Sequence, residues 1–79
     1  MTVRVLLFAS WADAVGARSV DVDVADEATA ADVIAAVEAR ARGAALPRPA
    51  LAVNRQLARA TDRVHGGDEV ALIPPVAGG

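Results

Sequence analysis

Only one stretch of this 79-residue chain carries a helical pattern long enough to cover a sheet. Thr29, followed three residues later by Asp32, resembles a capping box and predicts that a helix begins there. Gly43 predicts its end. Its apolar stripe comprises Ala30, Val33, Ile34, Val37 and Ala41, opposed by Asp32, Glu38, Arg40 and Arg42. A chain with one helix of this length must build the rest of its core from strands, as one layer of helix on one layer of sheet.

The hydrophobic core must stabilise this domain without covalent cross-links. The chain contains no cysteine, so disulfides, thiolate metal sites and thiol nucleophiles are excluded. His65 is the only histidine and cannot build a zinc centre alone. A length of 79 residues leaves room for one domain only.

Strand patterns occupy the first quarter of the chain. Residues 3–9 are apolar on both faces, which predicts a strand that ends at Ser10. Residues 11–15 predict one or two helical turns before Gly16. Residues 19–24 alternate strictly between valine and polar side chains, which predicts a strand with one wet face.

The second half predicts shorter strands separated by turns. Residues 50–53 form an apolar run that ends at Asn54 and Arg55, a turn signal. Residues 56–64 allow two interpretations, a helix with an arginine stripe or a turn-rich stretch with a short edge strand. Gly66, Gly67 and Asp68 then predict a turn before a last strand over residues 69–73.

Charge and hydropathy exclude several classes of partner. The chain has no lysine, eight scattered arginines and a net charge of −2, so no cluster can neutralise a run of phosphates. Nucleic acid is therefore not expected as a partner. We also expect no membrane span and no signal peptide, because the apolar runs are short and no basic segment precedes a long one. A cytoplasmic location fits this composition.

The C-terminal residues suggest a chemical use for the end of the chain. Pro74 and Pro75 must end the last strand, because proline donates no backbone N–H. Gly78 and Gly79 lack Cβ atoms, so they leave the terminal carboxyl unhindered. From Pro74 to Gly79 an extended chain reaches roughly 20 Å, enough to enter the active site of another protein. A carboxylate is a poor electrophile, and the chain has no phosphate-binding loop with a lysine, so a partner enzyme must activate it.

These residues also carry a family resemblance over essentially the whole chain. The segments 3–16, 51–54 and above all 67–79, with its acidic turn, apolar strand, double proline and diglycine, resemble the small subunit of molybdopterin synthase, a sulfur carrier. The diglycine end alone is shared with ubiquitin-like modifiers and the thiamine sulfur carrier. The proline pair favours the molybdopterin member.

The resemblance implies an α+β, β-grasp (ubiquitin-like) fold, with a mixed sheet of four to five strands on one main helix. It implies a domain over residues 1–75 and a flexible diglycine tail over 76–79, formed by Val76, Ala77, Gly78 and Gly79. The Gly79 carboxylate would be adenylated by an E1-like enzyme that uses ATP, converted to a thiocarboxylate with sulfur from a donor protein, and inserted into the large synthase subunit.

There, the resemblance implies, it donates sulfur to cyclic pyranopterin monophosphate, in a heterotetramer of two small and two large subunits. The large subunit would carry the catalytic side chains. This chain would bind no cofactor or metal itself.

One interface can be predicted from strand faces alone. The first and last strands are apolar on both sides, and one helix covers only one side, so the other needs a cover. If the two strands are neighbours, Leu6, Phe8, Ala71 and Ile73, or their opposites, form a patch beside the root of the tail. With Pro74 and Pro75, this patch is the predicted partner interface.

Trp11 and His65 have simpler interpretations than catalysis. Trp11 is expected to be a core lid or interface anchor, and His65 a solvated loop residue. Asp68 and Glu69 are expected to serve turn formation and solvation. Three alternatives to the leading function stay open: a thiamine-type carrier, a protein modifier joined to target lysines through Gly79, and a non-covalent adaptor with an inert tail.

Overall fold

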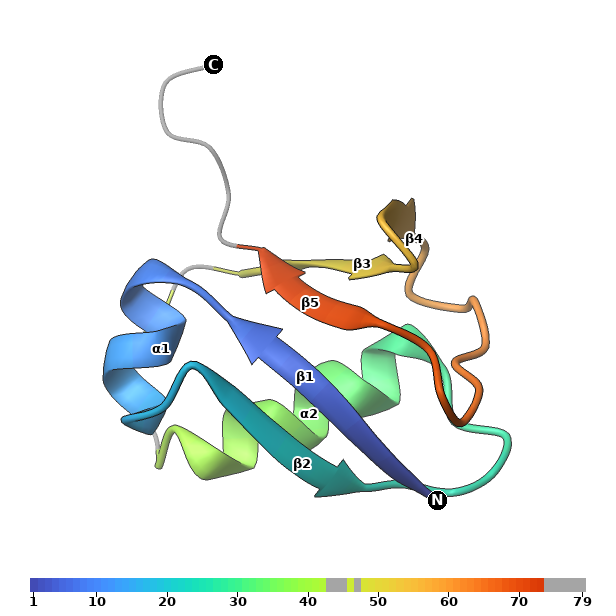
Figure 1. The fold of residues 1–79 in the computed structure, drawn as a ribbon, viewed down its shortest axis with the longest axis horizontal. Helices are drawn as coiled ribbons and strands as arrows, with labels where there is room; N and C mark the ends of the chain where they lie inside the picture. The colour runs from blue at the N-terminus through green and yellow to red at the C-terminus, as the bar shows by residue number, and fades with distance from the viewer. Residues whose placement is uncertain (43–45, 47, 74–79) are drawn as a thin grey trace.

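The computed structural model describes residues 1–42, 46 and 48–73, and within them five strands form one mixed sheet in the order β2-β1-β5-β3-β4 (Figure 1). The central pair, β1 and β5, is parallel, and every other neighbouring pair is antiparallel. The elements are β1 (Thr2–Leu7), α1 (Ala9–Val15), β2 (Ser19–Asp23), α2 (Ala30–Arg40), β3 (Ala50–Val53), β4 (Gln56–Ala58) and β5 (Val70–Ile73). The predicted α+β architecture with one main helix is confirmed.

Strand β1 is one residue longer at its start and two shorter at its end than predicted. Phe8 is the N-cap of α1, with an extended backbone, and Ala9 begins the helix with a φ of +50°. This turn of the backbone ends the strand before Phe8 can pair. The short helix itself is confirmed, and so is its stop at Gly16, which takes a φ of +83°.

The N-terminus of α2 confirms the predicted capping box. The Asp32 N–H donates to Thr29 Oγ1 at 3.4 Å, and the Thr29 N–H donates to Asp32 Oδ2 at 3.0 Å. The helix ends at Arg40, earlier than predicted. Ala41 is its C-cap, and Arg42 takes the left-handed conformation with a φ of +53° that was expected of a glycine. Gly43 lies outside the described residues.

The β3–β4 hairpin decides between the two interpretations of residues 56–64. Asn54 and Arg55 both have positive φ, at +51° and +69°, as a two-residue type I′ turn requires. The edge-strand interpretation is right and the helical arginine stripe is wrong. Chain reversal after β4 is fixed at Asp62, whose side chain accepts from the Arg59 N–H at 2.8 Å.

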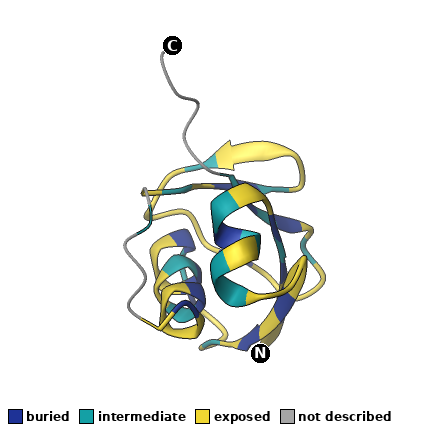
Figure 2. Cartoon of the chain, turned by 90° about the vertical axis from the view of Figure 1, so that its left-hand side faces the viewer, coloured by how far each residue is buried: buried dark blue, intermediate teal, exposed yellow. Residues whose placement is uncertain are grey.

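The core lies between the helices and one face of the sheet, as the distribution of buried residues in Figure 2 shows. Trp11 contributes from α1 and is 2% exposed, which confirms its place in the core. The strands contribute alternate residues and α2 contributes its predicted stripe. Among the fully buried side chains are Val3, Val5, Val33, Val37, Leu51, Val64, Val70 and Leu72.

We expect the substitution Thr29→Ala to lower the free energy of unfolding by about 1 kcal/mol, because it removes the hydroxyl that accepts from the first turn of α2. Urea denaturation at neutral pH measures this change. Thr61→Ala is the matched control, since Thr61 is exposed in a turn and its side chain makes no hydrogen bond with the described residues. Equal effects of the two substitutions would contradict the capping role.

Candidate functional site

The sheet face opposite the helices carries a continuous apolar row. Strand register places Leu6 beside Ala71, Ala71 beside Ala52, and Ala52 beside Leu57, so four strands contribute one side chain each. We call Leu6, Ala71, Ala52 and Leu57 the apolar row. Leu57 is 74% exposed at the sheet edge. Leu6 and Ala71 are half-buried and Ala52 is buried, so the row offers uncovered apolar surface at Leu57 and, in part, at Leu6 and Ala71.

The remainder of this open face is polar. Thr2 and Asp23 lie opposite each other, with Thr2 Oγ1 2.8 Å from Asp23 Oδ1. Arg4 lies opposite Asp21, with Nε 3.0 Å from Oδ1, and this hydrogen bond lowers the pKa of Asp21. Apolar surface is thus confined to the half of the face where β5 ends.

The predicted interface residues gather where β5 leaves the sheet. Leu7 pairs with Leu72, and the residues that follow this pair are Phe8, the N-cap of α1, and Ile73, the last residue of β5. Phe8 is 48% exposed, and Leu6, Ala71 and Ile73 are half-buried on the open face. Of the two alternative faces left open by the sequence, this one is uncovered. The other predicted site residues, Pro74, Pro75, Val76, Ala77, Gly78 and Gly79, lie outside the described residues.

Ala52 and Leu57 were not predicted as site residues from the sequence. Their positions depend on the β3–β4 hairpin, whose existence the sequence left open. Leu57 could have been found from its setting, because a leucine two residues after an Asn-Arg turn pairs with the residue two before it. That spacing places Leu57 on the same face as Ala52.

Asp68 ties the two turns at the other end of β5 together. Its carboxylate accepts from the His65 N–H at 2.7 Å and from Asn54 Nδ2 at 3.1 Å, and Asn54 Oδ1 accepts from the Glu69 N–H at 2.9 Å. The His65 N–H lowers the pKa of Asp68, and the Asn54 amide adds to the effect. Turn formation by Asp68 is confirmed, but its side chain is only 17% exposed rather than solvated. His65 is a solvated loop residue, as expected, with 73% of its side chain exposed.

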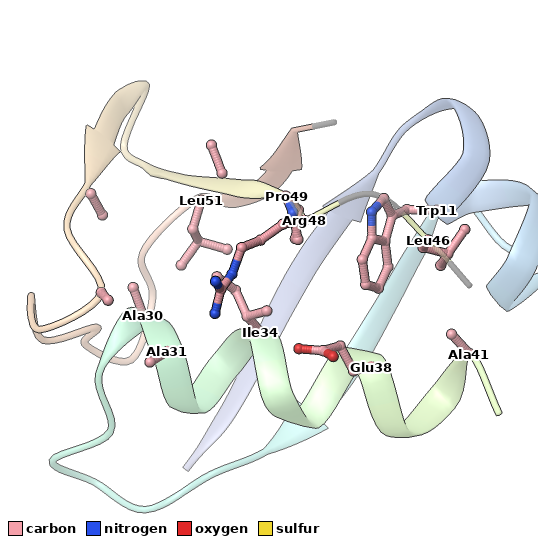
Figure 3. A pocket seen from close by; sticks show the side chains of 13 residues that line it. Trp11, Ala30, Ala31, Ile34, Glu38, Ala41, Leu46, Arg48, Pro49 and Leu51 are labelled. Atoms are coloured by element: carbon pink, nitrogen blue, oxygen red, sulfur yellow. The ribbon is translucent and has the colours of Figure 1, made fainter. Parts of the chain in front are cut away.

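A hollow of about 770 Å³ lies on the helix side of the sheet, between α2 and the start of β3 (Figure 3). Trp11, Ile34 and Leu51 line it, and Glu38 and Arg48 project into it from opposite walls. It is therefore separated by the sheet from the apolar row.

Two further classes of site are absent from residues 1–42, 46 and 48–73. No group of three or more histidine, cysteine, aspartate or glutamate side chains there could hold a metal ion. No helix in that part of the chain has the length and apolar character to cross a bilayer.

Solved structures share this fold along the whole chain. SAMP1 (small archaeal modifier protein 1) from Haloferax volcanii is 30% identical over 100% of both chains, with a TM-score of 0.80. A Pyrococcus furiosus protein, described as subunit 1 of a molybdopterin converting factor, is 21% identical. The match covers 96% of this chain and 99% of that protein, with a TM-score of 0.79. At that identity the likeness shows the fold alone.

A third structure is a protein–protein complex of subunits 1 and 2 of the molybdopterin-converting factor from Helicobacter pylori. It is 23% identical over 100% of both chains, with a TM-score of 0.64, and again shows the fold. A mixed sheet of this strand order packed on one main helix is the β-grasp, ubiquitin-like fold.

Within that class the family is also defined. The ThiS family model matches residues 5–79, and the chain belongs to the ThiS family. A search of curated proteins gave no match.

We expect Asp68→Asn to lower the free energy of unfolding by about 1 kcal/mol at pH 7, because the amide cannot accept from His65 as a carboxylate does. The pKa of Asp68 is lowered in the folded state, so its stabilisation is complete above the unfolded value of about 3.9 and is lost as pH falls through the folded value. Urea denaturation at several pH values should show the gap between the two proteins closing below about pH 4.

Asp13→Asn provides the control for this pH series, since Asp13 is exposed and has no ion pair among the described residues. A gap between wild type and Asp68→Asn that is the same at pH 7 and pH 3 would be inconsistent with a charge-assisted bond.

Proposed function

We propose that this protein is a sulfur carrier and the small subunit of a molybdopterin synthase. The observation that supports this most directly is the ThiS family match, which extends through the double proline to Gly79. The protein acts as a co-substrate, and its reactive group is the Gly79 carboxylate. In this proposal ATP for activation is bound by an E1-like adenylyltransferase, and both proteins act in the cytoplasm.

The proposed reaction activates the terminal carboxylate and then replaces one of its oxygens. The carboxylate attacks the α-phosphorus of ATP, which gives an acyl adenylate and releases pyrophosphate. The terminal sulfur of a persulfide on a donor protein attacks the acyl carbon and expels AMP, which gives an acyl disulfide. A thiol reductant then cleaves the S–S bond, which leaves the thiocarboxylate on Gly79 and a disulfide between the donor cysteine and the reductant. The thiocarboxylate sulfur then bonds to a carbon of cyclic pyranopterin monophosphate in the large subunit, and water cleaves the acyl–sulfur bond. The sulfur stays on the pterin, and Gly79 regains its carboxylate. The slim segment from Val76 to Gly79 suits this role, because small side chains fit a narrow channel.

The open face is the proposed docking surface for the large subunit and the activating enzyme. Phe8 and Ile73 adjoin the point where β5 ends, so a protein that covers the apolar row also receives the tail from a fixed position. Pro74 and Pro75 belong to this interface in the proposal. Subunits 1 and 2 form a complex in the Helicobacter pylori protein, which supports a large-subunit partner here.

A second function is favoured by the similarity to SAMP1. In a modifier, the same activated Gly79 would form an isopeptide bond with a lysine of a target protein. A thiamine-type carrier would use the same thiocarboxylate in another pathway. These alternatives share the activation step and differ in the acceptor.

Incubation with the activating enzyme, ATP and a sulfur donor should raise the mass of the intact chain by about 16 Da, because sulfur replaces one oxygen at Gly79. Intact mass spectrometry measures this shift. The loaded protein mixed with the large subunit and cyclic pyranopterin monophosphate should return to its original mass as the pterin gains sulfur. Laddered conjugates in a cell extract would instead indicate the modifier.

Two altered chains control this experiment. Removal of Gly79, or addition of one residue after it, should abolish sulfur transfer and leave the thermal unfolding temperature unchanged, because the reacting carbon is displaced from its position. Sulfur transfer by either chain would contradict the mechanism.

Leu57→Asp and Phe8→Asp should each weaken binding to the large subunit by about tenfold or more, since a charge would be placed in a desolvated apolar contact. Isothermal titration calorimetry measures the affinity, and circular dichroism checks that the domain stays folded. Ala35→Asp places the same charge on the exposed side of α2 and serves as the control. Unchanged affinity of both variants would exclude the open face as the interface.

A further inference from the structure

A second, smaller hollow lies beside the point where β1 ends. Its volume is about 440 Å³, and its lining is apolar except for one arginine. The lining residues are Leu6, Leu7, Phe8, Ala9, Ala12 and Arg18. Leu6 also belongs to the apolar row, so the hollow continues the open face toward α1.

Arg18 is held at this hollow by the backbone. The Leu7 N–H donates to the Arg18 carbonyl at 2.8 Å, which fixes the start of β2 against the end of β1. Among the described residues, no carboxylate lies within ion-pair distance of the Arg18 guanidinium, whereas Arg4 and Arg55 each have one. Arg18 is therefore an exposed cation with no counter-charge in the described part of the chain.

A strained backbone conformation and an exposed aromatic ring both lie at this hollow. Ala9 takes a φ of +50°, in the left-handed region that side chains other than glycine rarely adopt. The strand thereby ends at Leu7, and Phe8 remains 48% exposed at the rim of the hollow. Strain of this kind persists where the surrounding structure holds it and is concentrated at functional sites.

We propose that this hollow receives an apolar side chain of the large subunit, with an adjacent aspartate or glutamate carboxylate that pairs with Arg18. The proposal rests on the function proposed above and names the chemistry of the partner at one point of the interface. A planar guanidinium binds a carboxylate through two parallel hydrogen bonds, so the pair fixes orientation as well as proximity.

The ion pair between Arg18 and the partner's carboxylate would orient the carrier, because of where it lies. Phe8 and Ile73 follow the paired residues Leu7 and Leu72, so the hollow, which Phe8 lines, lies at the level where β5 ends. A contact at this position that combines an apolar side chain with an ion pair would fix the rotational orientation of the carrier on the large subunit. The apolar row alone sets no such direction, because apolar contact is non-directional.

The test compares the binding of three variants to the large subunit of the same organism. Arg18→Glu should raise Kd by about tenfold or more at about 50 mM salt, chiefly through slower association, and by less at about 500 mM salt. Arg18→Gln, which keeps the side-chain length, should fall between that variant and wild type. Arg42→Glu changes the net charge by the same amount on the helix side and should stay within about twofold of wild type.

A charge exchange identifies the partner group. Each exposed acidic residue of the large subunit is replaced in turn by arginine, and one replacement should restore the affinity of Arg18→Glu. The proposal is overturned if Arg18→Glu and Arg42→Glu bind alike, or if no exchange restores binding. Wild type that fails to bind the large subunit at all would reject the proposed function instead, so the two failures are distinguishable.

Discussion

The parallel pairing of β1 with β5 is the interaction on which the rest of the structure depends. It joins the first strand of the chain to the last described one and places β5 between β1 and β3, in the middle of the sheet (Figure 1). Val5, Val70 and Leu72, which belong to this pair, are all 0% exposed. Without the pair, the β1–β2 hairpin and the β3–β4 hairpin would have no common sheet on which α2 could pack.

One-sided cover is the second property that links fold to function. The helices bury one face of the sheet, and a domain of this size has no further layer for the other. The open face is therefore divided by side-chain chemistry alone, with the Arg4–Asp21 ion pair and the Thr2–Asp23 hydrogen bond at the β2 side and the apolar row from Leu6 to Leu57. A partner that binds the protein close to the point where β5 ends requires apolar surface there.

Much of the fold could be predicted from the sequence because local signals agree with the tertiary structure. The capping box at Thr29, the alternation in β2 and the glycine stop at Gly16 depend only on neighbouring residues. The end of β1 was placed too late because Phe8 and Ala9 are apolar and fit a strand equally well. Nothing in their sequence indicates the positive φ of Ala9.

The candidate site was predicted in part for a similar reason. Leu6, Phe8, Ala71 and Ile73 follow from the period of two in their strands, once those strands are assumed to be neighbours. Ala52 and Leu57 require the register of a hairpin, and the environment of Asp68 requires two turns that are distant in sequence. Arg18 gives no signal in the sequence, since its place beside the hollow depends on how the β1–β2 connection closes.

The central place of β5 has a consequence for synthesis on the ribosome. Strand β5 follows the other four strands in the chain, so the β1–β2 pair and the β3–β4 hairpin are translated before the strand that joins them. Contacts between residues so far apart in the chain form late and slowly. A truncated product that stops before Val70 lacks the strand that joins the two halves of the sheet, so the sheet can be completed only once translation has passed that point.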